Sequence, residues 1–362
     1  MSSQLGNKFK VNIFGESHGK CIGVVIEGIP AGFEIDLDKL NLFMQKRKGK
    51  KNISTARNES DEVNIVSGFF NAKATGTPLT AIIKNSDVKS KDYEQLKNIF
   101  RPSHADYTGY VKYNGFNDYR GGGHFSGRLT APLCVAGNIA MQILKKNYCI
   151  EIFSHIINIG CLDMGEKSFY SATYEEIKSI NNKSLAFIDE NAMNIAIEEI
   201  EKVKKNGDSV GGVIETGIFG IKTGIGEPIF DTIEGNIAKA IFAVPAVKGI
   251  DFGAGFSAGY MKGSEYNDRL NYVNDDEKNL KIETKTNHDG GINGGISNGM
   301  PIIFNTAVKP TPSIYIPQET INISTGKNTT LQIKGRHDPA IVTRAVYPVM
   351  SAAAIALLDL IL

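Results

Sequence analysis

Tryptophan is absent from this chain, and only four of its 362 residues are cysteines. The four are not closely paired in the sequence; they are Cys21, Cys134, Cys149 and Cys161. A zinc ribbon or a disulfide framework would need paired cysteines, whereas a chain of this size can fold around an ordinary core. We therefore expect buried, reduced thiols.

A surplus of one charge is also missing. The 40 lysines and arginines are balanced by 39 aspartates and glutamates, so the net charge is +1. Nucleic-acid-binding proteins usually carry a basic surplus or stripe, so no nucleic-acid partner is expected. Hydrophobic residues make up 41% of the chain, which is typical of a folded globular protein and not of a disordered one.

The start of the chain has no apolar stretch typical of a signal peptide, because Gly6 and Lys8 occur there. The one long apolar run, residues 345–362, is interrupted by Pro348 and Asp359 and is followed by nothing basic. A buried core helix is the preferred interpretation of this run, and a tail anchor is the alternative. We predict a cytoplasmic protein without a membrane partner.

Strand and helix signals alternate along the chain without a linker-like run. Segments rich in β-branched residues and bounded by glycine or proline predict strands; they are residues 21–29, 63–70, 79–84 and 210–230. Predicted helices follow Asp36, follow the loop at Gly127 and span residues 191–205. Residues 160–190 are polar and irregular, which indicates a variable surface segment. The whole chain, residues 1–362, is therefore predicted to be a single compact domain.

A weak internal repeat bears on the fold. The pattern R-x-x-x-P-x-x-x-A-x-x-I-A begins at Arg128 and again at Arg344, and in each copy another arginine lies eight residues upstream. The repeat favours two related α+β halves, about residues 1–150 and 205–362, each placing one apolar helix in a shared centre. The predicted fold class is α+β, a layered sandwich with apolar helices packed between antiparallel sheets and an internal duplication.

Arginine usage points to a polyanionic substrate. The chain strongly prefers lysine, yet it keeps eight arginines, most of them in glycine-rich segments or close to a histidine; they are Arg47, Arg57, Arg101, Arg120, Arg128, Arg269, Arg336 and Arg344. The arginine side chain presents a planar, permanently charged fork to a phosphate or carboxylate, which lysine cannot do. Ordinary surface arginines are the alternative, but these would be scattered as lysine is.

Five of the six histidines lie in loop-like contexts; they are His18, His104, His124, His288 and His337. An imidazole can take up or release a proton near neutral pH, so histidines gathered among arginines and glycines suit general acid–base catalysis. Metal ligation is the rival interpretation. It would favour an H-x-x-x-H or H-E-x-x-H spacing, which is missing, so no metal site is expected.

The segment from Arg120 to Arg128 contains three consecutive glycines and opens onto a predicted helix. Backbone N–H groups of glycines can approach an oxyanion closely, and a helix N-terminus attracts negative charge, so this segment is a candidate anion cradle. It matches no nucleotide-binding fingerprint. Residues 15–20 are one residue short of a Walker loop, and residues 253–259 miss the dinucleotide-binding spacing by one.

Seven sequence motifs, in order along nearly the whole chain, resemble those of chorismate synthase. They are F-G-E-S-H-G at 14–19, R-P-S-H-A-D-Y-T at 101–108, D-Y-R-G-G-G-H-F-S-G-R at 118–128, A-V-K-G-I-D-F-G at 246–253, G-G-I-S-N-G at 294–299, K-P-T-P-S at 309–313 and G-R-H-D-P at 335–339. The resemblance implies a lyase of the shikimate pathway, and so of aromatic amino acid biosynthesis. Its reaction would be the 1,4-elimination of phosphate from 5-enolpyruvylshikimate 3-phosphate to give chorismate.

The same resemblance implies a dependence on reduced FMN (FMNH2), although the reaction involves no net redox change. The substrate proton is only weakly acidic and is hard for an ordinary base to remove, so electron density from a reduced flavin would help phosphate to leave. A homotetramer of layered α+β subunits is also implied. NADPH is expected only as a source of reducing equivalents, and the compact chain favours an external flavin reductase as a partner.

Specific residues carry the implied chemistry. His18 would be the acid for the leaving phosphate, and His104 would control the protonation of the flavin. Ser17 and Asp338 would form a relay that helps the flavin accept the substrate proton. The implied substrate-binding residues are Arg47, Arg101, Arg128 and Arg336. The implied flavin-binding residues are His124, Phe125, Ser126, Pro245, Ala246, Gly294, Lys309, Pro310, Thr311, Pro312, Ser313 and Arg336.

Two positions depart from the usual pattern of the family. His124 follows the glycine triplet where the family usually has arginine, so flavin or substrate affinity is predicted to depend on pH. The basic segment of residues 46–57 is one residue shorter than usual. Arg47 aligns well with the family, but a second basic contact at Lys50 or Lys51 stays open.

Two other functions stay open. A phosphatase or phosphotransferase with the same anion cradle would need a metal-ligand cluster or a covalent nucleophile beside a base. The sequence shows no clear set of residues for either. A non-catalytic module that binds a metabolite or a nucleic acid is the other alternative.

Overall fold

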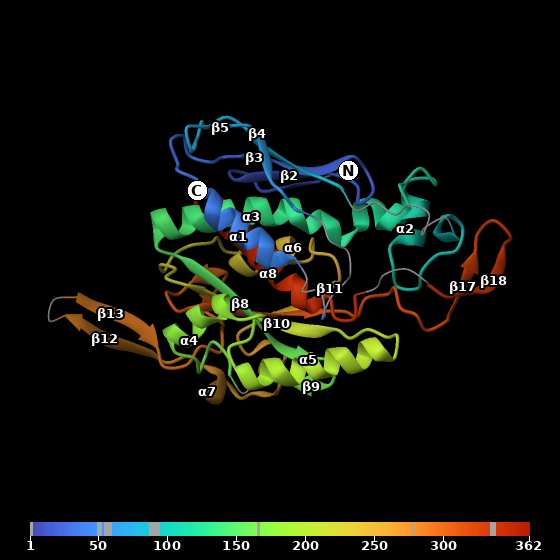
Figure 1. Cartoon of the computed structure of the whole chain (residues 1–362). Coiled ribbons are helices and arrows are strands. Elements are labelled where there is room, and N and C mark those ends of the chain that lie inside the picture. The colour runs from blue at the N-terminus through green and yellow to red at the C-terminus, as the bar shows by residue number, and fades with distance from the viewer. Residues whose placement is uncertain are drawn as a thin grey trace.

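The computed structural model describes residues 3–48, 53, 60–86, 95–164, 167–276, 279–333 and 338–362. The fold is mixed α+β. Figure 1 shows two sheets with a layer of helices between them. Two further hairpins project from the body of the molecule (Figure 1).

The first sheet is built from the N-terminal part of the chain. Its strands, in order across the sheet, are β1 (Gln4–Leu5), β2 (Lys10–Gly15), β3 (Cys21–Glu27), β7 (Leu79–Lys84) and β4 (Asn64–Ser67), each antiparallel to its neighbour. In the central strand β3, Ile22, Val24 and Ile26 alternate along the chain and are fully buried. Successive side chains of a strand point to opposite faces, so these residues share the face that lies on the helices.

The second sheet is also antiparallel. Its strands, in order, are β11 (Val247–Phe252), β16 (Ile302–Val308), β10 (Gly212–Phe219), β8 (Glu151–Ile159) and β9 (Leu162–Asp163). The central strand β10 pairs along its whole length with β8 and nearly so with β16. Its Ile214 and Ile218 lie on the same face and are fully buried, so this sheet also has apolar side chains in the core.

The helix layer consists of α3 (Thr130–Tyr148), α8 (Val342–Ile361), α1 (Leu37–Arg47) and α6 (Ile233–Ile241). Helix α3 contacts β2, β3 and β7 of the first sheet and also β8 of the second, whereas α8 contacts β8, β10 and β16 of the second. The two helices pack closely on each other, because a Cβ added to Gly137 of α3 would collide with Ser351 of α8. Both helices are buried along most of their length, as their apolar sequences predict.

Helix α8 contains the apolar run for which a tail anchor was the alternative. Among the described residues it is the one helix long and apolar enough to cross a membrane. Its buried residues run from Val342 to Leu358, and its neighbours are α1, α3, α6 and the second sheet. This burial is the behaviour expected of a core helix.

The remaining elements surround this core; they are β5 (Phe69–Phe70), β6 (Lys73–Ala74), β12 (Leu270–Asp276), β13 (Asn279–Thr284), β14 (Ile292–Asn293), β15 (Ile296–Ser297), β17 (Gln318–Asn322), β18 (Lys327–Leu331), α2 (Asp106–Lys112), α4 (Tyr174–Ser179), α5 (Glu190–Lys205), α7 (Gly263–Tyr266) and the 3₁₀ segments η2 (Arg120–Phe125), η3 (Gly127–Leu129), η4 (Ile180–Asn182) and η5 (Gly255–Tyr260). The projecting hairpins of Figure 1 are β12–β13 and β17–β18.

The strand predicted at 63–70 is two strands, because Gly68 between them has φ +76°.

The expectation of buried thiols is only partly correct. All four cysteines are free, but Cys149 and Cys161 are exposed. Cys149 ends α3 in a left-handed conformation with φ 59°, and Cys161 lies in the turn before β9. Both positions are at the ends of elements, where the core does not cover them.

The segment at residues 160–190 is not only surface, contrary to its polar sequence. Its Ile177 and Phe187 are buried. It also makes contact with the second sheet, because Ala186 accepts a hydrogen bond from the backbone N–H of Ile156 at 2.8 Å. The segment therefore covers part of this sheet.

Candidate functional site

A cavity of about 690 Å³ lies between the first sheet and the segments that follow β16 and α6. Its apolar wall includes Leu5, Val11, Ile13, Leu129 and Leu133. Its polar wall gathers side chains from segments far apart in the sequence; they are Arg101, His104, His124, Lys239 and Lys309. The cavity thus combines an apolar slot with a cationic edge.

The glycine triplet of η2 lies between two histidines. Gly121, Gly122 and Gly123 have φ values of 60°, 84° and 53°, a backbone that residues with a side chain rarely adopt. A Cβ at Gly121 would lie 2.5 Å from Cδ2 of His18, and one at Gly122 would lie 3.3 Å from Nε2 of His104. Glycine is therefore required here for both imidazole rings to approach the backbone.

Ser17 and His18 lie in the turn that follows β2. Both are buried, with exposed fractions of 0% and 6%. The Ser17 N–H donates to the carbonyl oxygen of Gly123 at 3.1 Å, which fixes the turn on the triplet. A Cβ at Gly121 would lie 3.0 Å from the Ser17 Oγ. The Ser17 hydroxyl and the His18 ring therefore face the same glycine.

His104 is held by two charged neighbours. Oδ1 of Asp106 lies 2.6 Å from His104 Nδ1 and 2.7 Å from Arg101 Nη2, and Oδ2 accepts from Arg101 Nε at 2.8 Å. Burial alone would raise the pKa of Asp106, but hydrogen bonds from Arg101 and His104 hold this pKa well below its usual range.

Protonation of His104 is disfavoured. Burial lowers the pKa of His104, and the charges of Arg101 and Lys309 act in the same direction, against the hydrogen bond to Asp106. Nδ1 lies 2.6 Å from the Asp106 carboxylate and 3.1 Å from Arg101 Nη2. The shorter contact is to a group that can only accept, so the neutral ring carries its proton on Nδ1 and its lone pair on Nε2. This Nε2 lies, with Cε1, on the edge of the ring that faces Gly122.

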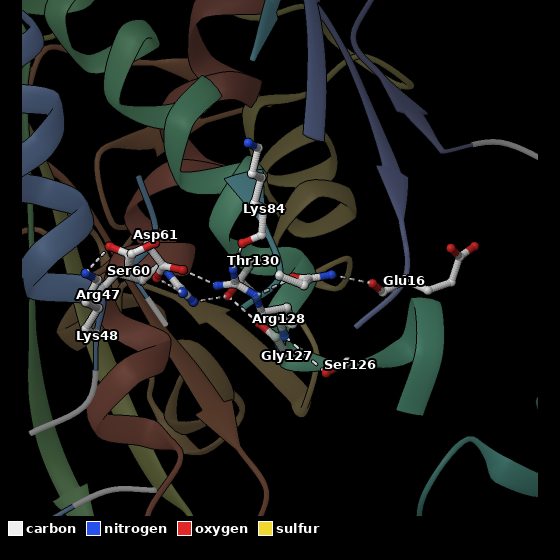
Figure 2. A network of polar contacts seen from close by, with 11 residues as sticks. Glu16, Arg47, Lys48, Ser60, Asp61, Lys84, Ser126, Gly127, Arg128 and Thr130 are labelled. Atoms are coloured by element: carbon white, nitrogen blue, oxygen red, sulfur yellow. Dashed lines mark hydrogen bonds and ion pairs between the residues drawn. The ribbon is translucent and has the colours of Figure 1, made fainter. Parts of the chain in front are cut away.

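A second charged group joins Arg47 and Arg128 through the buried carboxylate of Asp61 (Figure 2). Arg47 Nη2 lies 2.6 Å from Oδ2, Arg128 Nη1 binds Oδ1, and Arg47 Nη1 donates to Thr130 Oγ1 at 3.0 Å. Burial would raise the pKa of Asp61, but the charges of Arg47 and Arg128 lower it below its usual value. The two guanidinium groups are thereby held side by side at the start of α3.

Arg128 is linked in turn to the segment that carries His18. Its Nε donates to Oδ1 of Asn85 at 3.1 Å. The Nδ2 of Asn85 donates to the carbonyl oxygens of Glu16 and Gly19 at 3.0 and 2.9 Å. A chain of hydrogen bonds therefore runs from the arginine pair to the turn at residues 16–19.

Most of the sequence-predicted site residues lie together. Those in the wall of the cavity are Arg101, His104, His124, Phe125, Ser126, Pro245, Ala246, Lys309, Thr311, Pro312 and Ser313. Arg101 Nη1 donates to Ser313 Oγ at 3.1 Å, and Lys309 Nζ donates to the carbonyl oxygen of Ser103. Pro310 belongs to the same segment but not to the wall.

Gly294 lies away from this group. It lies in the turn between β14 and β15, where its neighbour Gly295 accepts a hydrogen bond from Ile233 at the N-terminus of α6. Ala246 follows the opposite end of α6. The nine residues of α6 span about 13 Å, so Gly294 is separated from the predicted flavin contacts of its own chain.

The described site residues that do not line the cavity include Ser17, His18, Arg128, Arg47 and Asp338. Asp338 is not in its wall and pairs with Arg344, whose Nε and Nη2 lie 2.8 and 2.7 Å from Oδ2. Arg47 and Arg344 line an adjoining pocket of about 20 Å³, which shares Gly127 with the cavity. Arg336 lies outside the described residues, as do Lys50 and Lys51.

Asp61, Asn85 and Asp106 take part in the polar contacts of the site but are not among the sequence predictions, and neither is Lys239 of the cavity wall. Asp106 could have been found, because it lies within the motif that contains His104. Asp61 and Asn85 lie in segments without a chemical signal. Their partner Arg128 is 67 and 43 positions away, so only the folded chain shows them.

Similarity to known proteins extends over nearly the whole chain. The family model described as Chorismate synthase matches residues 9–362. A chorismate synthase of Dehalococcoides mccartyi is 45% identical over 368 residues, covering 100% of this chain and 97% of its own. One of Thermococcus kodakarensis is 41% identical over 354 residues, covering 98% and 96%. A crystal structure of chorismate synthase is similar with a TM-score of 0.75 and 25% identity, covering 98% of this chain and 92% of that one.

Proposed function

Because the chain belongs to the chorismate synthase family, we propose that phosphate is eliminated from 5-enolpyruvylshikimate 3-phosphate in the cavity described above. The chain is an enzyme, a carbon–oxygen lyase of the shikimate pathway that forms chorismate for aromatic amino acid biosynthesis. One observation carries the assignment of the site: His18 and His104 meet at the glycine triplet, beside a cavity with a cationic edge.

The residues of the cavity fit a flavin mononucleotide. Its volume of about 690 Å³ is in the range of roughly 300–1,000 Å³ typical of cofactor sites. A flavin combines a flat, largely apolar ring with a phosphate; Val11, Ile13 and Leu133 suit the ring, and Lys309 and His124 suit the phosphate. When bound, reduced FMN would supply the electron density that the departing phosphate requires.

We assign the remaining wall residues to the same cofactor. They are Phe125, Ser126, Pro245, Ala246, Thr311, Pro312 and Ser313. The Arg101–Ser313 hydrogen bond supports this, because it ties the segment after β16 to the charged group around His104. Pro310, Arg336 and Gly294 stay predictions for this role.

The substrate carries one phosphate and two carboxylates, and we assign their binding to Arg47, Arg101 and Arg128. The buried Asp61 neutralises one of the two guanidinium charges of Arg47 and Arg128, which leaves one for an anion. A guanidinium that is already held in place loses little side-chain entropy when it binds. Arg336 is predicted to complete the set.

We assign His18 as the acid that protonates the leaving phosphate. Its ring is buried against Gly121, next to the Ser17 hydroxyl, so it is held in one orientation. His104 would exchange a proton with the flavin through Nε2. A relay from Ser17 to Asp338 would have to accommodate Arg344, which already binds Asp338.

A homotetramer is the assembly that we propose. In support, several large apolar side chains are exposed, among them Phe256 at 86% and Tyr260 at 93% in η5 and Phe230 at 92%. Gly294 is distant from the cavity of its own chain, so a flavin contact from it would have to be made in another copy. A cytoplasmic location, an external flavin reductase and NADPH as the reductant stay predictions from the sequence and the family resemblance.

We also propose that the fold is a layered sandwich that arose by internal duplication. The repeated arginine–proline pattern begins beside α3 and within α8, and these two helices pack on each other. Helix α3 lies mainly on the first sheet and α8 on the second. Arg128 and Arg344 thus lie near the N-terminal ends of the paired helices.

Anaerobic phosphate release from 5-enolpyruvylshikimate 3-phosphate, with and without chemically reduced FMN, tests the proposal. Release only with reduced FMN, together with the absorbance of chorismate, is the expected result. Release without chorismate would support a phosphatase instead. No release from folded protein under either condition would overturn the proposed site.

A further inference from the structure

Asn85 uses every hydrogen-bonding atom of its side chain. Oδ1 accepts from Arg128 Nε at 3.1 Å. Nδ2 donates to the carbonyl oxygens of Glu16 and Gly19 at 3.0 and 2.9 Å, which lie at the two ends of the turn that contains His18. One half-buried amide thus joins a substrate-binding arginine to the segment that holds the proposed acid.

The backbone strengthens this junction. The N–H of Asn85 donates to the carbonyl oxygen of Lys20 at 3.3 Å, so the residue binds the chain on both sides of Gly19. Asn85 directly follows β7, which pairs with β3 in the middle of the first sheet. The amide is therefore fixed to the rigid part of the molecule.

An amide is the group that these contacts require. It offers an acceptor on one atom and two donors on the other, within one short side chain. Aspartate would keep the contact to Arg128 but would turn a second oxygen toward the two carbonyl oxygens. Alanine would remove all three hydrogen bonds.

Arg128 also affects the strength of the contacts to the turn. Its guanidinium is anchored on the other side by Asp61 (Figure 2), so Oδ1 of Asn85 faces a fixed cation. A cation bound at the oxygen of an amide polarises the group and strengthens its N–H donors. The two donors of Asn85 are therefore better than those of an isolated amide.

We propose that Asn85 is a positioning residue that holds the turn of Ser17 and His18 in a fixed relation to the Arg128 guanidinium. It does not touch the reacting atoms and acts through His18. This rests on the roles assigned above to His18 and Arg128.

Two measurements on Asn85→Ala test the proposal. In the flavin-free protein, hydrogen exchange of the Ser17, His18 and Gly19 amides should rise roughly tenfold or more, while exchange in β3 stays unchanged. With substrate and reduced FMN, kcat should fall about tenfold or more, but by less than about threefold in a His18→Ala background, because a residue that acts through His18 loses its effect once the imidazole is gone.

Asn322→Ala is the matched control. Its Oδ1 also holds a turn, accepting from Ser324 N and Oγ at 3.0 and 2.7 Å, but this turn carries no proposed site residue. Neither exchange at residues 17–19 nor kcat should change in the control. Unchanged exchange in Asn85→Ala, or an equal loss of kcat with and without His18, would overturn the proposal. If the unmutated protein were inactive, the assigned function would be wrong. The hydrogen-exchange result would still show whether Asn85 holds the turn of Ser17 and His18 in place.

Discussion

The carboxylate of Asp359 accepts the backbone N–H of Phe9 at 2.8 Å and so joins residues 350 positions apart. The same carboxylate accepts the N–H groups of Asn7, at 2.8 and 2.9 Å, and Lys8, at 2.6 Å. The connection between β1 and β2 is thereby fastened to the end of α8. Since Leu5 and Val11 on either side belong to the cavity wall, the last helix holds the first sheet at the site.

Removal of this contact should destabilise the whole fold. We expect Asp359→Ala to lower the free energy of unfolding by about 2 kcal/mol, because hydrogen bonds to a charged group are lost. Asp359→Asn keeps an acceptor and should lose less. Urea unfolding of both variants measures the difference, and equal stability of Asp359→Ala and the unmutated protein would contradict the role of the contact.

Gly121 should be essential for activity through the position of His18. We expect Gly121→Ala to lower kcat about a hundredfold, because a Cβ 2.5 Å from the ring must displace it. Gly326 is the matched control: it has a similar φ of +64°, but nothing lies within 4 Å of an added Cβ. Gly326→Ala should introduce the same backbone strain as Gly121→Ala, but its kcat should equal that of the unmutated protein. A similar loss of kcat in both variants would show that displacement of the His18 ring is not the cause.

Asp61→Asn should harm both stability and substrate binding. Two buried guanidinium groups would lose their shared counter-charge, so we expect the free energy of unfolding to fall by about 3 kcal/mol. In conditions where the variant stays folded, KM for the substrate should rise. Chemical denaturation and steady-state kinetics measure the two effects. As a control, Asp231→Asn at an exposed position should change the free energy of unfolding by less than about 0.5 kcal/mol.

Acid should weaken the fold through Asp61 and Asp106. The folded state lowers the pKa of both carboxyl groups, so the unfolded chain binds more protons as the pH falls past their ordinary value of about 3.9. Their contribution to stability is therefore present above that pH and is lost progressively below it. Denaturant unfolding between about pH 2 and pH 5 should show this slope, and the slope should be smaller in Asp106→Asn. A parallel slope in the variant would exclude Asp106 as a source.

Flavin affinity should respond to the protonation of His124. Its Nδ1 lies 2.9 Å from the carbonyl oxygen of Gly15, so the ring donates there and offers a second donor at Nε2 only when it is protonated. We expect affinity for FMN to be higher at acidic than at alkaline pH, and His124→Arg to remove this dependence. Identical pH profiles for the two proteins, measured by flavin fluorescence, would exclude the effect.

The local motifs were sufficient to predict many of the residues that gather around the cavity. Arg101 and His104 lie in one short loop, and Phe125 and Ser126 lie in another. Each motif therefore places several neighbouring residues at the cavity together. Buried helices could likewise be predicted from their apolar sequences, because burial on every face leaves no polar stripe.

The connections between motifs could not be predicted in this way. Asp61 carries no motif, and its role depends on Arg47 and Arg128 reaching it from different elements. Exposure of Cys149 and Cys161 depends on where α3 and β8 end, and the distance of Gly294 from Ala246 depends on the direction of α6.

The amino-acid sequence by itself determined the family, the reaction and the polar groups that line the cavity, because these reside in short runs of adjacent residues. The tertiary structure alone decided which charges neutralise one another and which amide joins Arg128 to the turn of His18. Such contacts form between residues distant in the chain, and their partners are set by the packing of two sheets on one helical layer.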